Sequence, residues 1–404
     1  EAIFFSPSDL ITFVESPFAS HMERSLLEDK SKSDLLDPKD AMLNNLQKKG
    51  YEHESAFLSS LVSDGKNVLE IKNDKTELML SKTKEAMAKG VDVIAQGYLQ
   101  LDNFGGLADF LIRVSGKSNL GDYHYEVWDT KLSKKMKPYF AVQLCSYAEM
   151  LKNIQGIKPE KVAIVLGDKK IIHLRTQDYF AYYSLLKSSF ISFHKNWQIG
   201  NQPDPADSIT HGRWSHYAKQ ILEERRHLSL IANITRAQIK RLEGAGIKTI
   251  DETASSSLES IPKLNREILD RLKAQAEMQI LSEDKDKPIY KILPHEGDRS
   301  LGLSLLPPHS DLDIFFDIEG FPHVEGGLEY LWGATHFNEL GERQFKDFWG
   351  HDAEQEKKAF SNFVDWAFAR WRKDPSMHIY HYGSYEVTAL RRLMGSNGIK
   401  EYEV

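Results

Sequence analysis

The chain has 404 residues, 41% hydrophobic and 27% charged, which is ordinary for a soluble globular protein and predicts two or three domains. Its net charge of −7 does not by itself predict nucleic-acid binding, so a local basic path would be needed. A single cysteine, Cys145, excludes intrachain disulfides and cysteine-based metal clusters. No apolar run reaches membrane-spanning length and no signal peptide is recognisable, so we expect a cytoplasmic protein with no membrane partner.

The N-terminal third predicts two helices and two strands. Residues 4–24 begin with the helix-capping pattern Ser6-Pro7-Ser8-Asp9, and residues 38–62 form a second helix that contains Gly50-Tyr51-Glu52-His53-Glu54. Residues 91–101 predict a strand paired with the strand over 105–114. Asp109 lies within the apolar run of that second strand, where an unpaired carboxylate would be costly. Asp109 is therefore a candidate site residue.

The segment from 123 to 151 carries the strongest pattern. Residues 123–129 alternate as a half-buried strand does and end in Asp129-Thr130-Lys131, which places the acid and the lysine on one side. The acid can bind a metal ion while the lysine meets an anion. A helix then begins at Pro138, and within it Gln143 and Tyr147 share a face. A hairpin over 161–175, turning at Gly167-Asp168, and a helix over 177–197 complete this region.

The ordered set Asp109, Asp129-x-Lys131, Gln143 and Tyr147 resembles the PD-(D/E)XK nucleases of the RecB type. The resemblance implies that Asp109 and Asp129 hold Mg²⁺ or Mn²⁺, and that Lys131 positions or activates the attacking water. Gln143 and Tyr147 would line the active site. In that group, a histidine from a GxxHE helix joins the metal site, which implies that His53 is a ligand. The alternatives for the neighbouring Glu54 are that it replaces His53 as the ligand or that it is a structural partner.

Two further features bear on cofactor and substrate. Iron–sulfur members of this group have a cysteine just after the first helix and others near a tryptophan; here Ser16 and the surroundings of Trp214 hold none, so no iron–sulfur cluster is expected. A cluster of lysines follows the strand and is either a DNA-binding path or a solvated loop: Lys134, Lys135 and Lys137.

After a linker over 201–227, residues 228–282 predict a separate helical unit. Two helices flank the turn that contains Gly244 and Gly246, with Thr249 as a cap, and this resembles a helix-hairpin-helix motif. Such a motif brings backbone N–H groups against a DNA phosphate, which would make Gly244 and Gly246 DNA-binding residues. The alternative is a small helical spacer that uses the same fold.

A second linker over 283–310 precedes residues 311–404, where an apolar strand carries Asp317 and Glu319 on one side. A strand over 329–334, a helix over 354–371 and the segment 378–386 with Glu386 follow. This order resembles the start of DEDD exonucleases of the RNase H-like fold, and implies a second metal site at Asp317, Glu319 and Glu386. The third motif of that group would lie beyond Val404, so we expect a truncated domain.

The sequence thus predicts an α/β chain with three parts: a PD-(D/E)XK restriction-endonuclease-like core over 1–200, an all-α helix-hairpin-helix unit and an incomplete RNase H-like domain. The combination resembles a bacterial family of RecB-like nucleases, some of which continue into a superfamily-one helicase. We therefore expect a Mg²⁺- or Mn²⁺-dependent deoxyribonuclease of repair, processing or defence, with DNA and a helicase domain of the same longer chain as partners. The alternatives are a non-catalytic DNA-binding scaffold and an exonuclease whose active centre is the RNase H-like site.

Overall fold

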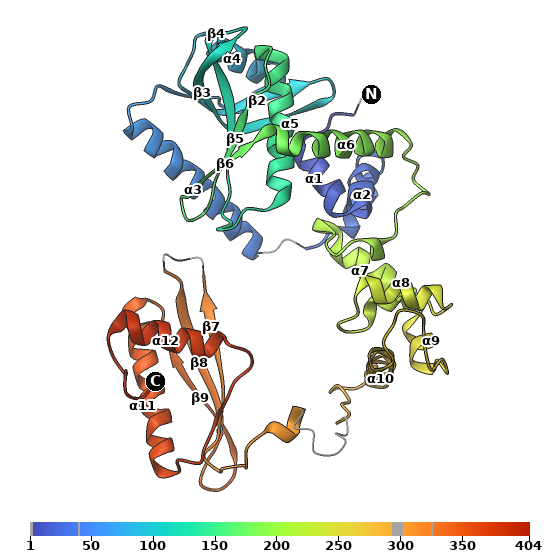
Figure 1. The fold of residues 1–404 in the computed structure, drawn as a ribbon, viewed down its shortest axis with the longest axis vertical. Helices are drawn as coiled ribbons and strands as arrows, with labels where there is room; N and C mark the ends of the chain where they lie inside the picture. Colours follow the sequence, from blue (N-terminus) through green and yellow to red (C-terminus); the bar gives the residue numbers. More distant parts are fainter. Residues whose placement is uncertain (1–2, 39–40, 293–301, 323, 325) are drawn as a thin grey trace. The chain divides into compact units, whose positions relative to one another are not determined.

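The structure, a computed structural model, describes residues 3–38, 41–292, 302–322, 324 and 326–404 and divides into two compact units, residues 1–291 and 292–404 (Figure 1). Part of the expected linker 283–310, residues 293–301, lies outside the described residues. Within the described ranges, no helix is both long and apolar enough to cross a membrane.

Unit 1 is built on one mixed six-stranded sheet in the order β1-β2-β3-β4-β5-β6. The strands are β1 Val68–Glu70, β2 Val93–Leu101, β3 Phe104–Ser118, β4 Gly121–Thr130, β5 Lys161–Val165 and β6 Ile171–Arg175. The central strands β2, β3 and β4 run antiparallel, whereas β4 and β5 are parallel because helix α5 (Pro138–Gln155) forms the crossover between them. The C-terminal ends of β4 and β5 therefore lie at the same edge of the sheet.

Helices cover both faces of this sheet (Figure 1). Because side chains alternate along a strand, Ile94 and Leu111 pack with α5 and its neighbours, while Val93 and Phe110 face α3 (Ala41–Ser63). The other helices that share a core with α5 are α1 Pro7–Glu15, α4 Thr76–Ala88 and α6 Thr176–Lys195. The expected strands, the hairpin and the helices over 38–62, 138–151 and 177–197 are confirmed; β1 and α4 were not predicted.

The expected N-terminal helix is two helices, α1 and α2 (Pro17–Glu28). Ser6 caps α1 as predicted, and Asp9 completes the capping box. The chain turns at Ser16, whose extended backbone (φ −156°) ends α1 and whose side chain caps α2 by accepting from the Ala19 N–H. Pro17 supplies the first residue of α2, where its missing N–H costs nothing.

The interpretation of 201–227 as a linker is wrong, because this segment is packed into unit 1. It contains α7 (Ser215–Glu224), and the fully buried Trp214 packs with Phe18 and Met22 of α2. The Trp214 indole donates to Glu23 at 2.8 Å, and Ser16 Oγ lies 3.1 Å from Nδ1 of His211. One aromatic anchor, one buried hydrogen bond and one partly buried hydrogen bond thus fix the segment against α2.

Buried histidines make unit 1 sensitive to acid. Burial, then the nearby Arg24 and His21, lowers the pKa of His194 to about 4. Between pH 6.5 and pH 4, His194 is therefore mostly protonated in the unfolded chain and mostly neutral in the folded chain. This contribution to stability is complete above pH 6.5 and is lost as the pH falls toward 4. Between pH 7 and pH 5 we expect a loss of about 1–2 kcal/mol from this residue, after allowing for partial solvent screening.

The test compares thermal unfolding of wild type and His194→Gln at pH 7 and pH 5. Glutamine can keep the contact that His194 Nε2 makes with Ser20 Oγ at 3.1 Å but takes up no proton. The fall in melting temperature should be smaller in His194→Gln, whereas His216→Gln, whose side chain is 71% exposed, should behave as wild type. An equal fall in all three proteins would contradict the assignment.

The end of unit 1 is a small helical subdomain with a core of its own. It contains α8 Arg236–Gly244, α9 Ile250–Ser255 and α10 Arg266–Ser282. Leu242, Ile250 and Leu269 lie at the centre of its core. Thr249 caps α9 as predicted, and Gly246 takes the positive φ of 86° that the turn requires. The two helices flanking this turn match the expectation, although α9 has only six residues.

Unit 2 is a four-stranded sheet in the order β10-β7-β8-β9 with helices packed on one face (Figure 1). Its elements are β7 Ile314–Phe321, β8 Leu328–Phe337, β9 Arg343–Trp349, α11 Ala353–Lys373, β10 Ile379–Tyr380 and α12 Tyr385–Asn397. Ile314, Phe316 and Ile318 of β7 pack against α11, and so Phe315, Asp317 and Glu319 alternate onto the open face.

Candidate active site

Asp109 and Asp129 lie opposite each other on neighbouring strands. Phe110 of β3 and Trp128 of β4 form the last pair of the β3–β4 ladder, and Asp109 and Asp129 are the next residues on the two strands. Residues directly opposite in such a ladder have Cβ atoms about 5 Å apart on the same face. Both carboxylates lie close enough to Tyr147 of α5 to contribute to the raised pKa of its hydroxyl, after the larger effect of burial. The structure brings together the two acids that the sequence singled out.

Hydrogen bonds fix the two acids and Lys131 relative to one another. The backbone N–H and the hydroxyl of Thr130 both donate to Asp109 Oδ2, at 2.8 and 2.9 Å. The Lys131 ammonium lies 2.5 Å from Asp129 Oδ2, and the Lys131 backbone N–H donates to the Val165 carbonyl at 2.9 Å. The pairing of β4 with β5 thus continues as far as Lys131, whose backbone is fixed by this hydrogen bond.

The charges in this cluster are not balanced. Asp129 is 5% exposed, and burial, then the negative charge of Asp109, raises its pKa well above the usual range. Burial lowers the pKa of Lys131, but Asp129 and Asp109 outweigh it, and the net pKa is raised. The buried Asp129 Oδ2 accepts no well-aligned hydrogen bond, although the ammonium is close. A bound cation would relieve both the repulsion and the unsatisfied oxygen.

Helix α5 adds the two residues that the sequence predicted. The Tyr147 hydroxyl donates to the Leu107 carbonyl at 2.7 Å. Burial, then Asp129 and Asp109, raises the pKa of Tyr147, and a hydrogen bond with Gln143 offsets part of this rise. Gly106 of β3 leaves room for this approach, since a Cβ there would lie 3.0 Å from the Tyr147 hydroxyl, a tight contact. Gln143 and Tyr147 therefore lie beside the acids.

Helix α3 contributes differently from the expectation. His53 Nε2 lies 3.3 Å from the Val165 carbonyl, the same oxygen that accepts from Lys131. Glu54 accepts a hydrogen bond from Gln96, and burial, then Asp109, raises the pKa of Glu54. Of these two residues, Glu54 has the electrostatic link to the acids. Across the described ranges, no three His, Cys, Asp or Glu side chains are arranged to hold a metal ion.

Gln96 is a site residue that the sequence reasoning missed. It falls between the pairs Ala95–Phe110 and Gly97–Ala108, so it lies across from Asp109, and its φ of 53° is in the left-handed region. A non-glycine residue with this conformation costs of order 1 kcal/mol and marks a constrained position. The only available signal was a lone polar residue inside an apolar strand. Its role here is to hold Glu54 next to Asp109.

The lysines after β4 lie on the exposed connection between β4 and α5. Lys134, Lys135 and Lys137 are all exposed, and the Lys137 ammonium lies 5.7 Å from the centre of the Tyr139 ring. None of the three forms an ion pair with a described carboxylate. They are therefore placed at the same end of the sheet as Lys131, with their charges turned toward solvent.

The glycine turn of the helical subdomain uses its own backbone donors. The N–H groups of Gly246 and Ile247 donate to carbonyls of Glu243 and Leu242, at 2.9 and 3.0 Å. The N–H groups of Lys248 and Thr249 donate to the Glu252 carboxylate, at 2.6 and 3.1 Å. A phosphate at this turn would have to displace Glu252, and Gly244 lies within α8 rather than in the turn itself.

The second set of acids is spread over two elements of unit 2. Asp317 and Glu319 are exposed on the open face of β7, whereas Glu386 of α12 is buried and 3.3 Å from Nδ1 of His381. The buried Glu386 Oε2 accepts no hydrogen bond. A separate network, missed in the sequence, joins Glu329 of β8 to Tyr385 at 2.8 Å and to Arg392 at 2.7 Å.

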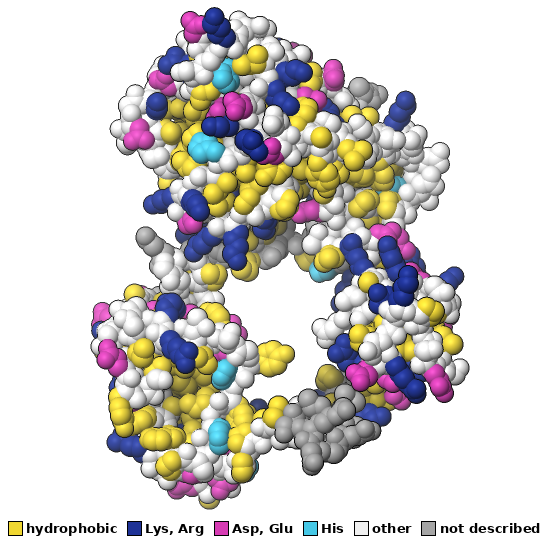
Figure 2. All heavy atoms as spheres, in the orientation of Figure 1, with side chains coloured by type: hydrophobic (Ala, Val, Ile, Leu, Met, Phe, Trp, Pro, Cys, Tyr) yellow, Lys and Arg dark blue, Asp and Glu magenta, His cyan; other side chains and the backbone are white. Residues whose placement is uncertain are grey.

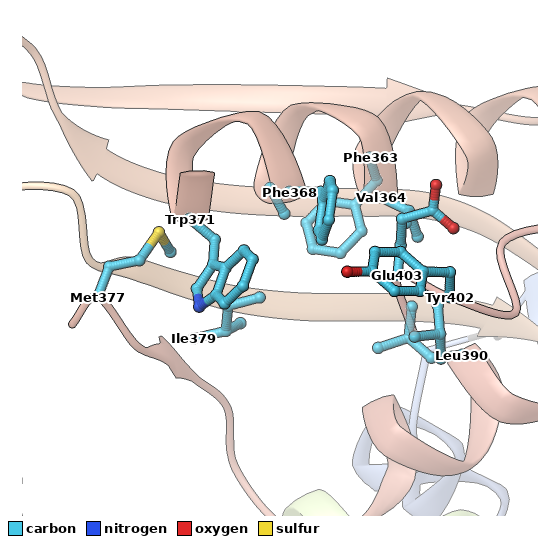
Figure 3. Close-up of a pocket in the computed structure, with 11 residues that line it drawn as sticks. Phe363, Val364, Phe368, Trp371, Met377, Ile379, Leu390, Tyr402 and Glu403 are labelled. Atoms are coloured by element: carbon cyan, nitrogen blue, oxygen red, sulfur yellow. The ribbon is translucent and has the colours of Figure 1, made fainter. Parts of the chain in front are cut away.

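An apolar pocket of about 460 Å³ lies between α11, β10 and the last residues described (Figure 3). Trp371, Ile379 and Tyr402 line it, and Glu403 is its only charged residue. It contains no group suited to phosphodiester chemistry and lies apart from the acids of β7 and α12 that the sequence singled out.

Comparison with known proteins bears on unit 2. Residues 314–404 match a sequence model of the RNase H superfamily. Unit 2 therefore carries an RNase H-like domain, as the sequence predicted, and such a domain suggests nuclease-type activity on nucleic acids. No curated protein matches the chain.

Proposed function

We propose that this protein is a divalent-metal-dependent nuclease that hydrolyses DNA at the cluster of Asp109, Asp129 and Lys131. The observation that carries the proposal is the proximity of two carboxylates on neighbouring strands, with Asp129 buried and the Lys131 ammonium 2.5 Å from its Oδ2. A cluster of like charges and a cation at a strand end is unfavourable for stability alone, and such unfavourable clusters are typical of catalytic sites.

The donor set fits a hard divalent cation. Mg²⁺ is bound in proteins by one or two carboxylates together with substrate phosphates, and Mn²⁺ accepts similar ligands. Asp109 and Asp129 would hold the ion, and Glu54 lies near enough that Asp109, after the larger effect of burial, raises the pKa of Glu54. When bound, the ion would neutralise the scissile phosphate and favour ionisation of the attacking water.

The protein's own residues would orient the reaction. Lys131, held by its backbone hydrogen bond to Val165, would orient the attacking water and stabilise the negative charge that develops on the phosphate. Thr130 keeps Asp109 in place through two hydrogen bonds. Tyr147, anchored on the Leu107 carbonyl, would close the side of the site toward α5, and Gln143 would hold Tyr147 or the DNA strand.

A second candidate function follows from the match of residues 314–404. In it, the active centre is the RNase H-like domain, through Asp317, Glu319 and Glu386, and unit 1 supports binding. Against it, Asp317 and Glu319 are exposed on an open face, and only Glu386 is buried.

A cleavage assay on end-labelled linear DNA and on circular DNA tests the proposed activity. The proposal requires metal-dependent product from at least one of these substrates, and the circular substrate separates internal cleavage from attack at ends. Absence of cleavage on both, with DNA binding intact, would favour a non-catalytic scaffold.

A further inference from the structure

Two connections of unit 1 are locked together beside the proposed active site. The Gly167 N–H in the β5–β6 turn donates to the Ser133 carbonyl in the β4–α5 connection at 3.1 Å. A Cβ added to Gly167 would lie 2.1 Å from the Leu132 carbonyl oxygen, which no real structure tolerates. Only glycine allows this approach, so the residues after Lys131 rest directly on the turn.

The turn itself is rigidly closed. The Lys169 N–H donates to the Leu166 carbonyl at 2.8 Å, and the Leu166 N–H donates to the Lys170 carbonyl at 2.9 Å. Lys169 takes a left-handed φ of 66°, and the Lys170 N–H donates to Asp168 Oδ1 at 3.2 Å. The turn therefore presents Lys169 and Lys170 at fixed positions rather than on a loose loop.

Together the two connections carry a concentration of positive charge that the whole chain lacks. Five exposed lysines lie on them, against one carboxylate, Asp168, while the chain as a whole has a net charge of −7. The five are Lys134, Lys135, Lys137, Lys169 and Lys170. None of them forms an ion pair with any carboxylate in the described ranges. Figure 2 shows Lys and Arg side chains at the lower margin of unit 1, where Figure 1 draws both connections and also the first turns of α3.

We propose that these five lysines form one two-loop basic surface that binds the sugar–phosphate backbone of the DNA substrate and leads it to Asp109 and Asp129. The inference rests on the proposed function and extends it by adding the β5–β6 turn to the substrate path. Unpaired lysines are suited to phosphates because each contact releases a counterion. They read no bases, so the surface binds without sequence preference.

The test measures binding of a fluorescent DNA duplex at several salt concentrations, in an Asp129→Asn background so that the DNA stays intact. The double variant Lys169→Ala, Lys170→Ala should weaken binding about 10-fold at low salt. It should also lower the slope of log K against log salt by about 1–2, since each phosphate contact contributes about 0.9.

The matched control is the double variant Lys117→Ala, Lys161→Ala, which removes the same charge from exposed positions of β3 and β5. Lys161 begins β5, and the other end of β5 leads into the β5–β6 turn. It should keep the wild-type slope. Equal loss in both double variants would overturn the surface as a specific path, and so would a wild-type slope in Lys169→Ala, Lys170→Ala.

A second variant tests the lock between the two connections. Gly167→Ala must displace Leu132 and with it Lys131. This variant is made in the wild-type background, with Asp129 intact, and should slow cleavage at saturating DNA at least ~10-fold. A normal melting profile would show that it is folded. Unchanged cleavage would overturn the lock. If the wild type cuts DNA but the lysine variants bind normally, only this inference fails; if the wild type neither cuts nor binds DNA, the proposed function fails as well.

Discussion

Asp129→Asn is expected to lower the single-turnover rate of DNA cleavage by at least ~10³-fold while unit 1 stays folded. The substitution keeps the size and most contacts of the side chain but removes the charge that would hold the cation beside Asp109. The buried Asp129 carboxylate is repelled by Asp109 and attracted by Lys131, so the two effects of removing its charge oppose each other, and a melting profile checks that the variant stays folded. Lys131→Ala should reduce the rate similarly, since it removes the cation that faces the reacting phosphate.

Asp122→Asn is the control for this prediction, because Asp122 lies on β4 as well but at its exposed opposite end. It should cleave at the wild-type rate. DNA affinity, measured without metal, should change little in Asp129→Asn. Wild-type cleavage by Asp129→Asn would refute the assignment of this residue.

Removal of divalent metal is expected to abolish cleavage completely, and either Mg²⁺ or Mn²⁺ should restore it. Without the ion, nothing held by the two carboxylates can neutralise the scissile phosphate or favour ionisation of the attacking water. The measurement is cleavage after dialysis against a chelator, followed by titration with each metal. Full activity in excess chelator would contradict the proposed chemistry.

The same preparation tests the iron–sulfur expectation. Ser16 is hydrogen-bonded to His211, and Trp214 packs against α2, so protein side chains fill this contact. Protein purified without oxygen should show no visible absorption from iron and sulfide. An iron–sulfur spectrum would overturn that expectation.

Local patterns predicted those parts of the fold that depend on local physics. Pro138 begins α5, Ser6 and Thr249 cap their helices, and the alternation before Asp129 marks β4. The site followed from the same rules, because acids on antiparallel neighbours and residues four apart on a helix must share a face.

Other features could not be predicted because they depend on distant contacts. The left-handed Gln96 is set by its hydrogen bond to Glu54 of α3, and Gly167 matters only because Leu132 rests on it. Trp214 is in the core because α2 packs on it, although its neighbours suggest a linker. For α3, the sequence left His53 and Glu54 as alternatives, and only the packing shows that Glu54 is coupled to Asp109.

The central claim is that cleavage occurs in unit 1 and not at the acids of unit 2. It is tested most directly by assaying Asp129→Asn beside the double variant Asp317→Ala, Glu319→Ala on the same DNA substrate. We expect the double variant to cleave within about 2-fold of wild type, because its two acids are exposed on the open face of β7. We expect Asp129→Asn to be inactive. Loss of cleavage in the double variant, with full cleavage by Asp129→Asn, would place the active centre in the RNase H-like domain.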